Sequence, residues 1–525
     1  MATPAAAPPH ASPAGAASLK GLAGWFTLPR LFSSAIFLIL LIPAIQPLTD
    51  PDFWWHVTAG NWMLAHHAIP RYDLFTYTVA DHRWITHEWL SEVSLAVLFA
   101  LGRLPLVSLV LGLCTAAGFL LIWRSIDRRI NFLIAALAVA LGVAAANPIW
   151  GPRIQMITFT LAALTYLWIQ RFCEGRSRAL FFLPAVVLLW ANLHAGFAIA
   201  YAFLGIALVA EALKLLTRRP DAMPWRRLRQ MAVVLAASLA VAVVNPNGWL
   251  IYPYALQTQA SAVQQKLIVE WFAPNFQMPE LWFFEGMIFL LLLGLGVARR
   301  IELRQLLLLL AGLGLALHSV RHLPLFVIVA VPPLSEFAQQ ALERWGAVLR
   351  RRRPLPANAL TLTVNLVVLL GVLATVLIAI RPALIERPDS KLVARDFPIA
   401  AANLLAAHPA PGHMLNQYGW GGYLVYRLFP TQPVFVYGDA AVTGDRLLQD
   451  YADIIYLSPR EPDLLDRYGI NWVIFKADDP LITSLRQQTA TPGHPGWFML
   501  GTYGQAAIMM RDTPANRAYA ATVSG

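Results

Sequence analysis

Residues 31–56 read LFSSAIFLILLIPAIQPLTDPDFWWH, an apolar run that ends at an acidic and aromatic segment. The apolar part, residues 31–48, approaches the roughly 20 residues that a helix needs to cross a hydrocarbon core about 30 Å thick. The segment after it opens with Asp50, Pro51 and Asp52 and is too polar to lie in lipid. This stretch therefore predicts a membrane-spanning helix with two carboxylates at its end.

The same pattern recurs along the chain, which is 58% hydrophobic and 13% charged with a mean hydropathy of +0.56. An ordinary soluble domain carries about 25% charged residues. The sequence thus predicts a polytopic α-helical membrane protein with about 11 to 12 transmembrane helices, and a lipid bilayer as its surroundings. The candidate spans lie near residues 31–48, 88–103, 105–123, 130–147, 153–171, 179–194, 197–215, 231–245, 285–298, 305–319, 322–340 and 360–380.

The net charge of +11 comes from short basic clusters between the apolar runs, so a nucleic-acid partner is not expected. Clusters near 171–178, 214–229, 299–304 and 344–353 are separated by even numbers of candidate spans and predict four cytoplasmic loops. The remaining connections then face outward. If residues 88–103 form a full span, a further cluster at 124–129 falls outside; either that segment lies partly in the interface or the loop breaks the charge rule.

This topology divides the chain into three parts. Residues 1–30 are expected to form a disordered cytoplasmic leader, and residues 31–381 a transmembrane domain with outward loops at 49–87 and 245–285. Residues 382–525 are expected to form a small periplasmic α/β domain of a protein in a bacterial inner membrane. The pattern there changes to strands at 433–437, 471–475 and the pair WFMLGTY and AAIMMR, with helices near 398–407, 443–457 and 481–488.

The first loop holds the candidate catalytic groups. Asp50 and Asp52 could act as a general base or bind a divalent cation such as magnesium or manganese, although Asp52 suits helix capping equally well. Glu88 is a third candidate, but with Glu92 it would also favour the positive end of a helix dipole without any catalysis.

The same loop is rich in histidine and tryptophan. Its histidines, which include His56 and His87, match no zinc-binding spacing. Residues 53–67 predict an interfacial helix with its tryptophans in the headgroup belt. In the second loop, the aromatic density around Glu270 and Trp271 suits sugar stacking and membrane anchoring alike.

Six motifs in the loops, DPDFWWH, IPRYDLFTYT, THEWL, WANLHAGF, NPNGW and VEWFAPNF, resemble the GT-C superfamily of integral membrane glycosyltransferases. The resemblance is to a bacterial branch related to protein O-mannosyltransferases and aminoarabinose transferases. It implies transfer of a sugar from a polyprenyl-phosphate-linked donor to a cell-envelope glycan or lipid at the outer face. Asp52 matches the first-loop acid of these enzymes, with Asp50 as the other candidate. The WWDYG motif of oligosaccharyltransferases is missing, so a protein acceptor is not expected.

A donor phosphate at the interface requires cations. The candidates on the outward side are Arg71, Arg83, Arg153 and Arg321, with His322 beside the last; each of them could instead snorkel or pair with Asp73, Asp81 or Glu270. Arg321 is the first choice because it lies in a short turn between two spans. The further substrate-binding candidates are His56, His87, His194, Glu270 and Trp271, and His194 suits a packing role equally well.

Two other functions stay open at this point. The chain could be a flippase or transporter of lipid-linked sugars, or a non-catalytic subunit of glycan assembly. A transporter would need a continuous polar path through the spans, whereas the ionisable residues here gather at one face.

Overall fold

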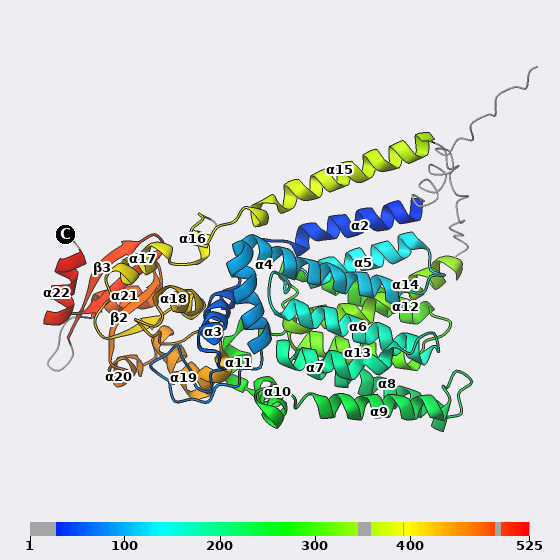
Figure 1. The fold of residues 1–525 in the computed structure, drawn as a ribbon, viewed down its shortest axis with the longest axis horizontal. Coiled ribbons are helices and arrows are strands. Elements are labelled where there is room, and N and C mark those ends of the chain that lie inside the picture. Colours follow the sequence, from blue (N-terminus) through cyan, green and yellow to red (C-terminus); the bar gives the residue numbers. More distant parts are fainter. Residues whose placement is uncertain (1–27, 345–358, 392, 489–494, 524–525) are drawn as a thin grey trace, which may run out of the picture.

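The computed structural model describes residues 28–344, 359–391, 393–488 and 495–523. Most of the predicted leader, residues 1–27, and the basic run Arg350–Arg353 lie outside the described residues. Long helices run side by side in a bundle, and the C-terminal domain covers one end of it (Figure 1). The helices of the bundle and its loops are α2 (Leu28–Ala44), α3 (Asp52–His66), α4 (Trp89–Ser125), α5 (Phe132–Ala146), α6 (Gln155–Cys173), α7 (Leu183–Leu193), α8 (Ala198–Leu216), α9 (Trp225–Val241), α10 (Ile251–Ala260), α11 (Ala262–Leu267), α12 (Trp282–Val297), α13 (Leu303–His318), α14 (Leu323–Arg344) and α15 (Ala359–Leu384).

Each predicted span corresponds to a helix of the bundle. Among the described residues, six helices are long and apolar enough to cross a membrane, and four shorter apolar helices accompany them. The two candidates at 88–103 and 105–123 are the halves of α4, which bends where Gly102 and Arg103 leave helical geometry. Pro105 follows the bend and removes one helical hydrogen bond donor. The number of crossings stays a prediction.

Helix α3 forms where the sequence predicts a helix, but its surroundings differ from the prediction. Trp54 and Trp55 are buried, and Trp54 packs edge-on against Phe397 and Tyr423 of the C-terminal domain. The headgroup placement is therefore wrong for these two residues. Protein rather than membrane covers α3, because this helix packs against both α4 and the C-terminal domain.

The C-terminal domain contains a four-stranded sheet in the order β1-β2-β4-β3, with β1 parallel to β2 and the other pairs antiparallel. This confirms the α/β class. The strands and helices are α16 (Val393–Asp396), α17 (Ile399–Ala407), β1 (His413–Asn416), α18 (Gly421–Leu428), α19 (Ala440–Ile455), α20 (Glu461–Arg467), β2 (Ile470–Lys476), α21 (Pro480–Gln487), β3 (Trp497–Tyr503), β4 (Ala506–Arg511) and α22 (Pro514–Val523).

The strand predicted at 433–437 is wrong, and β1 was missed. Residues 434–436 use their backbone groups elsewhere. Val434 forms an isolated bridge with Thr76, while the Asn416 side chain accepts from the N–H groups of Phe435 and Val436 and donates to the Val436 carbonyl. A side chain and the first loop therefore replace the neighbouring strand that the apolar pattern predicts.

The first loop is bound to the C-terminal domain by several hydrogen bonds. Tyr437 donates its hydroxyl to Asp73 at 2.9 Å, and Trp84 donates its indole N–H to Asp439 at 3.0 Å. Helix α18 crosses the start of α3 so closely that a Cβ on Gly422 would lie 2.4 Å from the Pro51 carbonyl oxygen. The loop and the domain thus form one packed unit at the end of the bundle.

Candidate functional site

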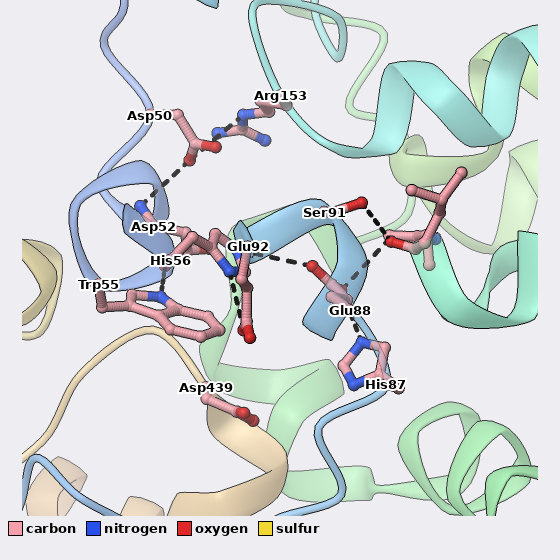
Figure 2. A network of polar contacts seen from close by, with 12 residues as sticks. Asp50, Asp52, Trp55, His56, His87, Glu88, Ser91, Glu92, Arg153 and Asp439 are labelled. Carbon is pink, nitrogen blue, oxygen red and sulfur yellow. Dashed lines mark hydrogen bonds and ion pairs between the residues drawn. The ribbon is translucent and has the colours of Figure 1, made fainter. Parts of the chain in front are cut away.

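Asp52 lies where the first loop, the start of α4 and the C-terminal domain meet (Figure 2). It is the first residue of α3 and follows the N-cap residue Pro51. Its Oδ1 accepts a hydrogen bond from the Trp55 indole N–H at 3.2 Å. The capping alternative for Asp52 is therefore wrong, because Pro51 holds the N-cap position and the Asp52 carboxylate binds Trp55.

The surroundings of Asp52 bring its proton affinity into the range useful for acid–base chemistry. Burial of the carboxylate and the nearby charge of Asp50 raise the pKa of Asp52 to about 7, although His56 and Arg153 act in the opposite direction. A general base works best when its pKa lies near the operating pH. Among the predicted catalytic residues, Asp52 thus has the property that proton abstraction requires.

The C-terminal domain contributes Gly438 and Asp439 to this site. A Cβ on Gly438 would lie 1.6 Å from Asp52 Oδ1, so only glycine fits there. Asp439 is nearby, but its Oδ1 caps α19 by accepting from two backbone N–H groups and its Oδ2 accepts from Trp84. Asp439 therefore serves as the N-cap of α19.

A row of alternating charges extends from Asp50 toward the bundle. Arg153 Nε lies 3.5 Å from Asp50 Oδ1, and the Arg153 guanidinium also pairs with Glu270. Glu270 in turn lies 3.8 Å from Arg321. The alternative that these arginines pair with Glu270 is thereby confirmed. Asp50, Arg153 and Glu270 line a cavity of about 290 Å³.

Glu88 forms the centre of a cluster of histidines. Its Oε1 lies 2.6 Å from His87 Nε2 and 3.7 Å from His194 Nε2, and its Oε2 lies 3.6 Å from His56 Nε2. Although burial raises the pKa of Glu88, the charge and hydrogen bond of His87 and the charge of His56 hold it well below its usual range. The motifs THEWL and WANLHAGF therefore meet at one carboxylate, which Figure 2 shows beside His87.

His194 has a defined tautomer. The Gly196 N–H donates to His194 Nδ1 at 2.9 Å, so that nitrogen is the acceptor and Nε2 carries the proton toward Glu88. Thr158 Oγ1 lies 2.9 Å from the same Nδ1. Burial lowers the pKa of His194 to about 4, and it is neutral at physiological pH.

Other predicted binding residues lie apart from this cluster. Arg71 is exposed and donates to the Pro246 carbonyl, which joins the two long loops. Trp271 is buried, and the Arg321 guanidinium covers its ring at 5.1 Å, so that face is not open for sugar stacking. His322 packs beside the same ring.

Several residues of the site escaped prediction. Trp55 was assigned to the membrane surface, and Gly438 carried no signal because glycine is common in loops. Glu92 was noted only as a helix-dipole residue, although its Oε1 lies 3.4 Å from His56 Nδ1. Only the folded chain brings these positions together.

A second cavity of about 410 Å³ lies between the first loop, α10–α11 and the start of α19. Its lining includes Arg83, Tyr254, Ser261 and Asp445. Ser261 donates its hydroxyl to Asp445 at 2.6 Å, which ties the second loop to the C-terminal domain. The cavity adjoins the histidine cluster through Tyr254, whose ring centroid is 4.5 Å from that of His87.

No protein-family model matches the sequence, and no curated protein matches it. Among solved structures, the archaeal oligosaccharyltransferase AglB from Archaeoglobus fulgidus, in complex with an inhibitory peptide and a dolichol-phosphate, aligns with a TM-score of 0.53 and 11% identity over 93% of this chain and 75% of that chain. The apo form of the Archaeoglobus fulgidus oligosaccharyltransferase aligns with a TM-score of 0.52 and 12% identity, over 92% and 75%.

The mycobacterial arabinofuranosyltransferase AftD aligns with a TM-score of 0.49 and 18% identity over 91% of this chain and 41% of that chain, which is too low to establish a shared fold. The archaeal structures, in contrast, match both the helical bundle and most of the remaining chain. This polytopic membrane protein therefore shares its fold with the archaeal oligosaccharyltransferase.

Proposed function

We propose that this protein is a membrane glycosyltransferase that moves a sugar from a polyprenyl-phosphate-linked donor to a hydroxyl of a cell-envelope glycan or lipid. A similar fold occurs in the archaeal oligosaccharyltransferase in complex with a dolichol-phosphate, which supports a lipid-linked donor. We place the reaction at the end of the bundle that the C-terminal domain covers. The observation that carries the proposal is Asp52, a carboxylate with a pKa of about 7 at this end.

In the proposed reaction, Asp52 takes the proton of the acceptor hydroxyl. The hydroxyl oxygen then forms a bond to the anomeric carbon of the donor sugar, while the bond from that carbon to the phosphate oxygen breaks. The electron pair of the broken bond leaves with the phosphate. A base with a pKa near 7 is ionised often enough to accept the proton and basic enough to hold it.

The leaving phosphate requires positive charge at the membrane end of the bundle. Arg153 and Arg321 supply two guanidinium groups there, beside the cavity of about 290 Å³. In this structure both guanidinium groups pair with Glu270, so a bound phosphate would take the place of the Glu270 carboxylate beside them. Arg153 and Arg321 are the proposed phosphate ligands, whereas Arg71 takes part in a contact between loops.

The expected magnesium or manganese ion does not fit the carboxylates as they are arranged. Arg153 already neutralises Asp50, and Trp55 occupies Asp52 Oδ1. Among the described residues, no group of three histidine, cysteine or acidic side chains is placed to hold a metal ion. In the proposed reaction the positive charge at the phosphate comes from arginine.

A periplasmic site in a bacterial inner membrane is part of the proposal. The start of α3, which carries the acidic and histidine residues of the site, lies at the end that the C-terminal domain covers, and the basic connection between α8 and α9 projects from the opposite end (Figure 1). Basic loops face the cytoplasm in most membrane proteins.

Buried charges inside the bundle give no reason to prefer transport. Glu211 Oε1 accepts hydrogen bonds from Lys214 at 2.9 Å and from Arg304 at 2.8 Å. These groups join α8 to α13 and satisfy one another, as buried ion pairs must.

The test is complementation of a deletion strain with the wild-type gene or with Asp52→Asn, followed by mass spectrometry of lipid-linked sugars and envelope glycans. We expect the variant to accumulate the donor and to leave the acceptor undecorated, at a protein level equal to the wild type. Asp81→Asn, at an exposed position of the same loop, is the matched control. Restoration of the glycan by Asp52→Asn would exclude the proposed base.

A further inference from the structure

Three side chains behind Asp52 form a buried group that the proposed reaction does not use. They are His56, Glu88 and Glu92, with exposed fractions of 6%, 8% and 1%. Two of them come from the start of α4 and one from α3, which pack against each other. A buried group of this kind needs an explanation, because burying charges costs free energy unless they are paired.

The geometry favours the protonated form of His56. Its Nδ1 lies 3.4 Å from Glu92 Oε1, and its Nε2 lies 3.6 Å from Glu88 Oε2. A neutral imidazole has only one N–H and would present a lone pair to one of the two carboxylates. Both ring nitrogens face acidic oxygens, so the imidazolium is the form that suits this position. Although burial lowers the pKa of His56, its contacts with Glu92 and Glu88 raise it to about 9.

His56 reaches Asp52 by two routes. It lies four residues after Asp52 on α3, and side chains at this spacing are neighbours on a helix surface. Its ring also packs on Trp55, with ring centroids 3.6 Å apart, and the Trp55 indole N–H donates to Asp52 Oδ1. The charge of His56 and its packing on Trp55 therefore both act on the Asp52 carboxylate.

We propose that His56 is a positioning residue, which stays protonated between Glu88 and Glu92 and thereby keeps Asp52 ionised and oriented through Trp55. This inference rests on the proposed function, since it concerns the same base. The other charged or ionisable groups that act on Asp52 are Asp50 from the first loop, Arg153 from the bundle and Tyr418 from the C-terminal domain.

The protonation of Asp52 can be measured without knowing the substrates. Dicyclohexylcarbodiimide adds to protonated carboxyl groups in apolar surroundings and remains attached as an N-acylurea. We would label the purified full-length protein in detergent from about pH 5 to about pH 10 and quantify the adduct on Asp52 by peptide mass spectrometry. Labelling of the wild type should fall with a midpoint near pH 7.

Replacement of His56 by glutamine removes the charge at nearly the same volume. We expect the midpoint for Asp52 to rise by on the order of one pH unit, because a positive charge that favours ionisation is lost while burial and Asp50, which disfavour it, remain. Glu92→Gln should raise it less, by weakening the charge on His56, and should cause no further rise when added to His56→Gln. His66→Gln, at an exposed position of α3, is the control and should leave the midpoint unchanged.

An unchanged midpoint in His56→Gln, in a protein with the elution volume and melting temperature of the wild type, would overturn the proposal. A rise from Glu92→Gln that persists in the His56→Gln background would overturn it too, because Glu92 would then act without His56. The labelling tests the coupling between His56 and Asp52, whereas the glycan assay tests Asp52 as the base, so the two proposals can be rejected independently. A shifted midpoint together with an active Asp52→Asn strain would reject the proposed base and leave the coupling between His56 and Asp52 standing.

Discussion

Replacement of Gly438 by alanine adds one methyl group at the closest point between the C-terminal domain and Asp52. The new Cβ would lie 1.6 Å from Asp52 Oδ1 and 3.1 Å from Trp55 Nε1. Non-bonded atoms settle roughly 3.5 Å apart, so the carboxylate or the domain must move by about 2 Å. Overpacking of this kind costs about 1–3 kcal/mol of stability.

The expected effect on activity is larger than the effect on stability. A shift of about 1 Å in a reacting group can reduce a rate on the order of 100-fold. We expect Gly438→Ala to accumulate to near wild-type levels in the membrane and to melt a few degrees lower in detergent. In the complementation assay it should leave the donor sugar untransferred.

Gly419→Ala is the matched control, because a Cβ at that position of the same domain meets no atom within 4 Å. It should behave as the wild type in both the melting and the glycan measurements. The reasoning fails if Gly438→Ala decorates the acceptor at the wild-type rate, since Asp52 would then tolerate a displacement that the proposed proton transfer forbids.

Three further predictions test separate parts of the site. The transfer rate of the wild type should rise with pH through about 7 and then level off, because Asp52 must be deprotonated to act as a base; a pH-independent rate over that range would contradict this. Glu270→Gln should tighten the binding of a polyprenyl phosphate by on the order of tenfold, measured by equilibrium binding in detergent, since it removes the carboxylate that competes for two arginines. Trp84→Phe should lower the free energy of unfolding by about 1–3 kcal/mol in thermal or denaturant unfolding, because it leaves a buried oxygen of Asp439 without its donor; an unchanged stability would show that this hydrogen bond contributes nothing.

The helices of the bundle could be predicted from the sequence because each is an apolar run of nearly the length that a membrane crossing requires. The break at Gly102 and Arg103 left a visible signal in Pro105, which separated two candidate spans. The placement of side chains was hardest to predict where an apolar segment could pack either against lipid headgroups or against other parts of the protein. Trp54 and Trp55 suit a headgroup region and a protein interior equally well. Residues far along the chain decide between the two: Phe397 and Tyr423 for Trp54, and Tyr437 for Trp55.

The residue types of the candidate site were also predictable, but their pairing was not. Acids and histidines in outward loops identified Asp52, Glu88 and His194. That one carboxylate would receive three histidines depends on the contacts of the start of α4 with α3 and with the end of α7, for which the sequence has no periodic signal. Gly438 was invisible for the same reason, because its importance lies in what a side chain there would touch.

The contacts around Asp52 also bear on what the C-terminal domain does. A domain that only recognised the acceptor could be attached to the bundle by a flexible linker and would leave the base intact when removed. Here the domain supplies the atoms that enclose the base: Gly438 closes over its carboxylate, and Asp439 holds Trp84 of the first loop in place. Burial is the largest cause of the raised pKa of Asp52. Loss of the domain would therefore return this carboxylate toward its ordinary acidity, and the proposed base exists only while the bundle and the domain are packed together.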